Sequence, residues 1–86
     1  MDLEDIADFR RAVRGHLAER PTVALTPGQI MSRLRREWGN QGVDYVNACE
    51  FLTGLGHLKL VPDSLGGSNK YYQATPEGII AHESGQ

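Results

Sequence analysis

Apolar residues recur at helical spacing along the first fifth of the chain. The stripe consists of Leu3, Ile6, Phe9, Val13 and Leu17. This spacing places the apolar side chains on one face of an α-helix. Acidic residues near its start and arginines toward its end both suit the helix dipole, and Pro21 ends it. The pattern predicts a helix over about residues 2–20 with one buried face.

The stretch TPGQ (26–29) is a start signal for a second helix. Thr26 can cap the helix, Pro27 suits its first position, and Gln29 can complete a capping box by accepting from the cap N–H. Apolar residues follow at i, i+4 and i+8, ending with Trp38, and Gly39 provides the stop. The sequence predicts a helix over about residues 27–38. We interpret Trp38 as a core anchor between this helix and the next.

A third apolar stripe predicts a helix over about residues 43–55, after the turn NQG (40–42). At about 100° per residue, its buried face holds Tyr45, Ala48, Cys49, Leu52 and Leu55. Its opposite face holds Asn47, Glu50 and Gly54. Gly56 supplies a left-handed stop.

Alternation with a period of two then predicts a β-hairpin over about residues 57–74. HLKLV (57–61) and KYYQA (70–74) form its strands, and the turn-rich PDSLGGSN forms its tip. The adjacent Tyr71 and Tyr72 must point to opposite faces, so one packs beneath the hairpin and the other is exposed. TPEG (75–78) opens a last helix over about residues 76–83, and TVAL (22–25) is a candidate short edge strand.

The composition fits one small globular domain spanning residues 1–86, with 40% apolar and 23% charged residues. No apolar run approaches the roughly 18 residues of a membrane span, and the acidic opening MDLEDIADFRR lacks the features of a signal peptide. The single Cys49 excludes an intrachain disulfide. We therefore expect a cytoplasmic protein that does not associate with membranes.

Charge is distributed unevenly, although the net charge is only −2. Residues 1–9 sum to −4, residues 10–36 to +6 and residues 37–86 to −4, and all seven positive residues of the middle segment are arginines. Two interpretations remain open. The arginines either cover solvated helix faces and pair with nearby acids, or they form a patch that faces phosphates.

The order helix, short strand, helix, turn, helix, hairpin, helix resembles that of the winged helix-turn-helix superfamily of bacterial and phage transcription regulators. The resemblance is carried by LTPGQIMSRLRREW, VDYVNACEFLTGLGHLKL and KYYQATPEG. They match the two helices of the motif, the helix-to-wing turn and the return strand of the wing. The resemblance implies a mainly α fold with a small β-hairpin (α+β): three core helices, a wing and a short C-terminal helix.

The resemblance also implies DNA binding, with the third helix in the major groove and the wing on the backbone. By position, Asn47 would meet an adenine edge and Glu50 a cytosine amino group, with Asp44 and Phe51 on one flank. The implied contacts to phosphates are Arg33, Arg35, Arg36, Gln41, Lys59, Ser68, Asn69 and Lys70. The expected function is that of a non-catalytic transcriptional regulator that binds double-stranded DNA without a cofactor.

One departure from the family pattern favours an alternative. From Val43 to Leu55 the chain contains no Lys or Arg, so the presented helix face is neutral to acidic. A winged helix that binds another protein instead of DNA would tolerate this face. The positions of Arg33, Arg35 and Arg36 distinguish the two functions. A face shared with the third helix and the wing favours DNA binding, whereas pairing with Asp5, Asp8 or Glu37 favours a protein partner.

Few positive residues per chain predict weak DNA binding by a monomer, which a homodimer through the first and last helices would strengthen. The adjacent Ile79 and Ile80 cannot both face one core stripe, so one of them is available to cover a partner. The remaining candidates for chemistry are His16, Cys49, His57 and His82. Their spacing matches no metal-ligand or catalytic motif, so we expect no metal site and no enzymatic activity.

Overall fold

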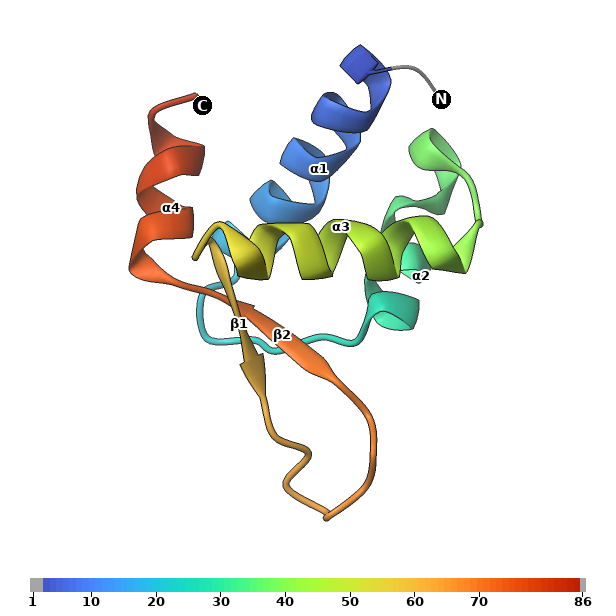
Figure 1. The fold of residues 1–86 in the computed structure, drawn as a ribbon, viewed down its shortest axis with the longest axis vertical. Helices are drawn as coiled ribbons and strands as arrows, with labels where there is room; N and C mark the ends of the chain where they lie inside the picture. The colour runs from blue at the N-terminus through green and yellow to red at the C-terminus, as the bar shows by residue number, and fades with distance from the viewer. Residues whose placement is uncertain (1–2, 86) are drawn as a thin grey trace.

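The computed structural model describes residues 3–85, and the expected helix start at residue 2 lies outside them. The elements, in chain order, are α1 (Leu3–Ala18), α2 (Pro27–Trp38), α3 (Gly42–Gly54), β1 (Leu58–Val61), β2 (Tyr71–Ala74) and α4 (Pro76–Glu83). Figure 1 shows α1 and α4 standing on one side of α3, while the hairpin projects from the other side. The predicted α+β class is confirmed. No helix among the described residues is long and apolar enough to cross a membrane.

The core lies where α1, α2 and α3 meet the base of the hairpin. Its largest fully buried side chains are Tyr45, Leu17, Ile30, Leu58, Val13 and Cys49. Phe9 forms an edge-to-face contact with Tyr45, with ring centroids 4.9 Å apart. Trp38 is partly buried against this core, and its ring centroid lies 5.7 Å from that of Phe9. Trp38 thus packs on the core, as expected of an anchor, and its ring contact is with Phe9 of α1.

Two leucines assigned to buried stripes are exposed instead, so those predictions are wrong. Leu3 is 85% exposed and Leu55 is 54% exposed. Leu3 occupies the first turn of α1, at the free end of the helix. Leu55 lies one residue beyond Gly54, where the chain leaves the helix toward β1. The helical period cannot show where packing ends, because it carries no information about the neighbouring elements.

The chain between α1 and α2 forms a turn and one bridge instead of the expected strand. α1 ends at Ala18, and Arg20 N–H donates to the Leu17 carbonyl oxygen in a tight i→i−3 turn. Leu25 then exchanges two backbone hydrogen bonds with Tyr72, of 2.9 and 2.8 Å. This single bridge attaches the α1–α2 connection to the outer edge of β2.

The hairpin register determines which side chains face α3. β1 and β2 are antiparallel, with Leu60 opposite Tyr72 and Lys59 opposite Gln73. Tyr72 is buried while Tyr71 is half-buried, which distinguishes the two faces. Because successive residues alternate, Lys59 points to the opposite face from Leu60 and Tyr72. Gly56 adopts φ +81° at the stop before β1, as the sequence predicted.

Both Thr-Pro helix starts are confirmed. Thr26 Oγ1 accepts from Gln29 N–H at 3.2 Å, and Gln29 Oε1 accepts from Thr26 N–H at 2.9 Å, which completes the capping box. Thr75 Oγ1 accepts from Gly78 N–H at 3.0 Å and donates to the Gly56 carbonyl oxygen at 2.5 Å. The second cap therefore also ties α4 to the turn that precedes β1.

Candidate nucleic-acid interface

The two residues expected to meet bases are both exposed on α3, but they border different neighbours. Asn47 lines a small pocket with Ile6, Phe9 and Arg10 of α1. Glu50 faces the hairpin. The two side chains are three residues apart, about 60° around the helix axis, so they flank the exposed ridge of α3 from opposite sides.

Glu50 belongs to an open cleft of about 230 Å³, here named the α3–hairpin cleft. Its lining residues are Glu50, Thr53, Leu60, Lys70 and Tyr72. Lys70 and Glu50 place opposite charges in this cleft, and within residues 3–85 neither side chain has an ion-pair partner. Burial raises the pKa of Tyr72, and the neighbouring Cys49 and Glu50 raise it further. The cleft therefore offers one cationic donor, one carboxylate acceptor and a neutral phenol.

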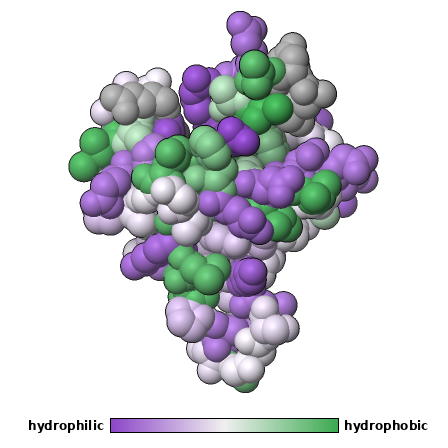
Figure 2. Space-filling view, in the orientation of Figure 1, coloured by the Kyte–Doolittle hydropathy of each residue, from purple (hydrophilic) through white to green (hydrophobic). Residues whose placement is uncertain are grey.

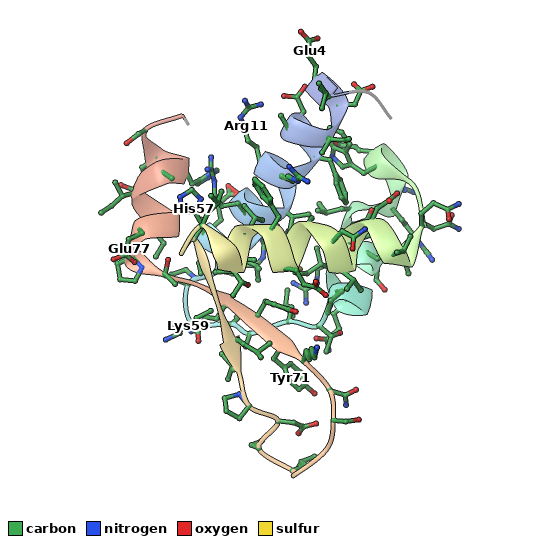
Figure 3. The ribbon with its side chains drawn as sticks, in the orientation of Figure 1. Glu4, Arg11, His57, Lys59, Tyr71 and Glu77 are labelled. Atoms are coloured by element: carbon green, nitrogen blue, oxygen red, sulfur yellow. The ribbon has the colours of Figure 1, made fainter. Side chains whose placement is uncertain are left out.

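Lys59 does not join this cleft. Alternation along β1 directs it to the face of Gln73, whose amide donates to the Pro21 carbonyl oxygen at 2.7 Å. Figure 3 shows Lys59 extending from the outer edge of the hairpin. The two hairpin lysines, which the sequence could not distinguish, therefore lie on different surfaces: Lys70 lines the α3–hairpin cleft and Lys59 lies on the opposite face of the hairpin.

The hairpin tip is polar and locally acidic. Ser68 and Asn69 are exposed. The Asn69 amide donates to Asp63 Oδ2 at 3.4 Å, and Asp63 Oδ1 accepts from Leu65 N–H at 2.9 Å. The Asp63 carboxylate therefore orders the tip, and it opposes a phosphate near Ser68 and Asn69.

The three arginines of α2 are not buried, and no carboxylate among residues 3–85 pairs with them. At about 100° per residue, Arg33 and Arg36 share one side of the helix, while Arg35 lies on the other flank. Burial lowers the pKa of His16, and the charges of Arg20 and then Arg33 lower it further. Arg33 therefore lies near His16, toward the end of α1. Asp8 pairs with Arg11 at 2.5 Å. The arginines are thus neither neutralised nor gathered on one face.

Gln41 stands at the start of α3, exposed and free of a side-chain capping bond. Its carbonyl oxygen accepts from Asp44 N–H at 3.0 Å. The side-chain amide is therefore available at the tip of the α2–α3 turn, as its position in the sequence suggested.

The residues considered for metal or redox chemistry lie apart. The described residues contain no group of three His, Cys, Asp or Glu side chains placed to hold a metal. Cys49 is fully buried, as expected for a core residue, and burial with the nearby Glu50 raises its pKa to about 12. A thiol with this pKa is protonated near neutral pH and chemically inert.

Sequence reasoning missed one residue, Arg14. Both interpretations of the arginines, solvated helix faces or a phosphate-facing patch, placed it at the surface, yet it is only 6% exposed. Its Nη1 lies 3.5 Å from His57 Nδ1, and its buried Nε has no hydrogen-bond partner in the part of the chain that the structure describes. The helical period could not have shown this burial, because Arg14 lies about 100° around the helix from the core residue Val13. It depends on how α3 and α4 pack on α1.

Comparison with known proteins identifies the fold. No protein-family model matches the chain, and no protein with a curated description matches it in sequence. The crystal structure of a mutant MepR from a multidrug-resistant S. aureus clinical isolate superposes with a TM-score of 0.75 at 20% identity, over 95% of this chain and 58% of the MepR chain. This chain thus spans little more than half of MepR.

A structure of HOP2, described for its DNA recognition and protein interaction domains and its homologous DNA pairing, superposes with a TM-score of 0.60 at 18% identity. That match covers 77% of this chain and 98% of the HOP2 chain. At such low identity the likenesses establish the fold and nothing finer. The resemblance to winged helix-turn-helix proteins is confirmed at that level, with α2 and α3 as the motif and the β1–β2 hairpin as the wing.

Proposed function

We propose that this chain is a non-catalytic winged helix protein that binds double-stranded DNA and regulates transcription. The observation that carries the proposal is the pair Arg33 and Arg36, exposed on one side of α2 with no carboxylate partner in the described chain. Unpaired guanidinium groups beside a helix-turn-helix suit phosphate binding, which supplies most of the affinity for DNA. The likeness to HOP2, described for DNA recognition, supports the same function.

In this proposal α3 enters the major groove and the α3–hairpin cleft faces the adjacent backbone. Glu50 accepts a hydrogen bond from a cytosine amino group, and Asn47, on the α1 side of the ridge, reaches an adenine edge. Lys70 contacts a phosphate and partly offsets the repulsion between Glu50 and the backbone. Arg35 and Lys59 lie on other faces of their elements, so we assign them smaller contributions than Arg33, Arg36 and Lys70.

We further propose that the DNA-bound form is a homodimer through α1 and α4. A handful of phosphate contacts per chain gives weak binding, and two chains on adjacent half-sites double that number. Both elements carry an exposed apolar side chain, Leu3 at 85% and Ile80 at 62%, while Ile79 packs on the core. Ile80 is therefore the member of the Ile79–Ile80 pair that is available to a partner.

The two hairpin lysines provide a matched test of the proposed orientation. Lys70→Gln removes a charge from the α3–hairpin cleft, and Lys59→Gln removes the same charge from the opposite face of the same hairpin. We expect K70Q to weaken binding to duplex DNA and to reduce the slope of log K against log salt by about 1. K59Q should leave both quantities nearly unchanged. Equal losses in the two variants would contradict the proposed orientation of the wing.

A further inference from the structure

A second surface lies between α1 and α3, and it adjoins the Asn47 pocket, with which it shares Arg10. This α1–α3 groove has a volume of about 170 Å³ and is lined by Ala7, Arg10, Arg11, Arg14, Phe51, Leu52 and Leu55. The α3 residues in the groove face α1, whereas Glu50 and Thr53 face the hairpin. In Figure 2 apolar and polar residues alternate across the part of this face formed by α1, α3 and α4.

The floor of the groove is apolar and open to solvent. Phe51 is 43% exposed and Leu55 is 54% exposed. The guanidinium carbon of Arg10 lies 3.7 Å from the centroid of the Phe51 ring. This cation–π contact holds the Arg10 side chain against the ring, and no carboxylate among residues 3–85 pairs with it. Arg10 therefore remains available to an incoming anion.

Arg14, at the inner wall of the groove, has no carboxylate partner among residues 3–85. It is 94% buried, on its exposed fraction of 6%. Within the described residues its Nε has no hydrogen-bond partner, and the contact between its Nη1 and His57 Nδ1, at 3.5 Å, is long. Burying a guanidinium without a carboxylate is costly, and a carboxylate that reaches it offsets much of that cost. Arg11, which stands on the α4 side of α1 in Figure 3, adds a third positive charge, partly offset by Asp8.

We propose that the α1–α3 groove binds an acidic amphipathic segment of another protein. Its carboxylates pair with Arg10, Arg11 and Arg14, and its apolar side chains cover Phe51 and Leu55. Arginine suits this role because its planar fork of donors matches a carboxylate and remains charged when desolvated. The inference does not rest on DNA binding, and it gives a definite site to the protein partner that the sequence left as an alternative.

The groove fits a protein segment better than it fits DNA or a second copy of this chain. A sugar-phosphate backbone would leave the exposed rings and methyl groups of Phe51 and Leu55 without an apolar partner. A second copy could offer the acidic start of its α1, but among the described residues only Glu4 there is uncommitted, because Asp8 pairs with Arg11 and Asp5 is engaged within the chain. An acidic segment from elsewhere brings uncommitted carboxylates.

The test uses a short fluorescein-labelled peptide of Glu, Asp, Leu and Phe with its apolar residues at helical spacing. A matched peptide with Gln and Asn in place of Glu and Asp controls for charge, and one with Ser in place of Leu and Phe controls for apolar contact. The protein variants are Arg10→Gln/Arg11→Gln and Phe51→Ser. Arg33→Ala/Arg36→Ala serves as the reciprocal control, because it removes the same number of arginines from the proposed DNA surface.

We expect the acidic amphipathic peptide to bind the wild-type chain. Affinity should fall at least about tenfold for either control peptide and for both groove variants. The groove arginine variant should retain duplex DNA binding, and the α2 arginine variant should retain peptide binding. The two arginine pairs are tested with different ligands, one with the peptide and one with DNA. A wild-type chain that binds the peptide but not DNA would therefore overturn the proposed function and leave this inference standing.

Three outcomes would overturn the inference. Equal peptide binding by wild type and groove variants would place the contact elsewhere. Competition between duplex DNA and the peptide, with DNA binding lost in R10Q/R11Q, would make the groove a phosphate site. Sedimentation that shows a homodimer dissociated by R10Q/R11Q and by the peptide would make the occupant a second copy of this chain.

Discussion

The carbonyl oxygen of His57 occupies the space that a side chain on Gly78 would need. A Cβ built on Gly78 would lie 2.1 Å from that oxygen. The first turn of α4 thus packs directly on the backbone that leads into β1, where Thr75 N–H donates to the same oxygen at 3.1 Å. Only a residue without a side chain permits this approach, so Gly78 determines how closely α4 docks on the hairpin base.

Gly78→Ala should therefore destabilise the fold. The obstructing atoms are backbone and cannot rotate away, so we expect a loss of about 2–3 kcal/mol in the free energy of unfolding, measured by urea titration. Gly54→Ala is the matched control, because Gly54 is helical and nothing lies within 4 Å of its Cβ position. It should cost nothing and can gain about 0.5 kcal/mol. A G78A variant as stable as wild type would show that α4 is free to shift.

Thr75→Ala should cost more than Thr26→Ala. Each threonine caps a helix, a contact worth about 1 kcal/mol. Thr75 Oγ1 additionally donates to the Gly56 carbonyl oxygen across the hairpin base, which adds about another 1 kcal/mol. Thr75→Ser keeps both hydrogen bonds and should preserve most of the stability. Equal losses for the two alanine variants would indicate that the Gly56 contact contributes nothing.

Arg14→Met should stabilise the isolated chain while abolishing peptide binding in the α1–α3 groove. Methionine keeps an unbranched apolar stem and removes a buried charge without a carboxylate partner, which often gains about 1 kcal/mol or more. Burial, then the charge of Arg11, lowers the pKa of Arg14, the direction expected of a destabilised guanidinium. Unfolding by urea and peptide anisotropy measure the two effects. A less stable R14M variant would mean that the guanidinium already serves the fold.

Cys49 should be inert to thiol reagents in the folded protein and should make stability fall at high pH. Its folded-state pKa of about 12 lies above the ordinary thiol value of 9.0. Above pH 9 the thiol of the unfolded chain loses its proton while the buried thiol keeps it, which favours unfolding. The contribution of Cys49 to the free energy of unfolding is therefore fully present below pH 9 and is lost as pH rises toward 12. We expect no reaction with Ellman's reagent at about pH 8 unless urea is added, and a weaker pH dependence of stability between about pH 9 and about pH 10.5 in Cys49→Ala. Rapid labelling of the native thiol would contradict its burial.

Local signals in the sequence were sufficient for the helix starts and the hairpin. The capping box at Thr26 and the Thr75 cap depend on neighbours within three residues, so their chemistry is visible in the sequence. Leu3 and Leu55 were assigned to the core because the helical period shows a face but not what covers it. Burial of Arg14 and its contact with His57, 43 residues away, depend on the packing of α1 against α3 and α4.

The candidate site was predictable in its residue types and less so in its geometry. The absence of basic residues from α3 was plain in the sequence, and the structure places Glu50 beside Lys70 in one cleft. The separation of Lys59 from Lys70 required the strand register. Helical spacing separates Arg35 from Arg33 and Arg36, but the neighbours that each arginine faces depend on how α2 packs. Sequence spacing alone could not assign these side chains to surfaces.

DNA binding itself is tested by fluorescence anisotropy of labelled duplex DNA at about 50 mM and about 200 mM salt. We predict binding that weakens steeply between the two concentrations, because counterions compete for the phosphates. We also predict a further loss and a shallower salt slope in Arg33→Ala/Arg36→Ala. No binding at about 50 mM salt with protein at about 100 µM, the weak end of ordinary non-specific affinity, would contradict DNA binding by this chain.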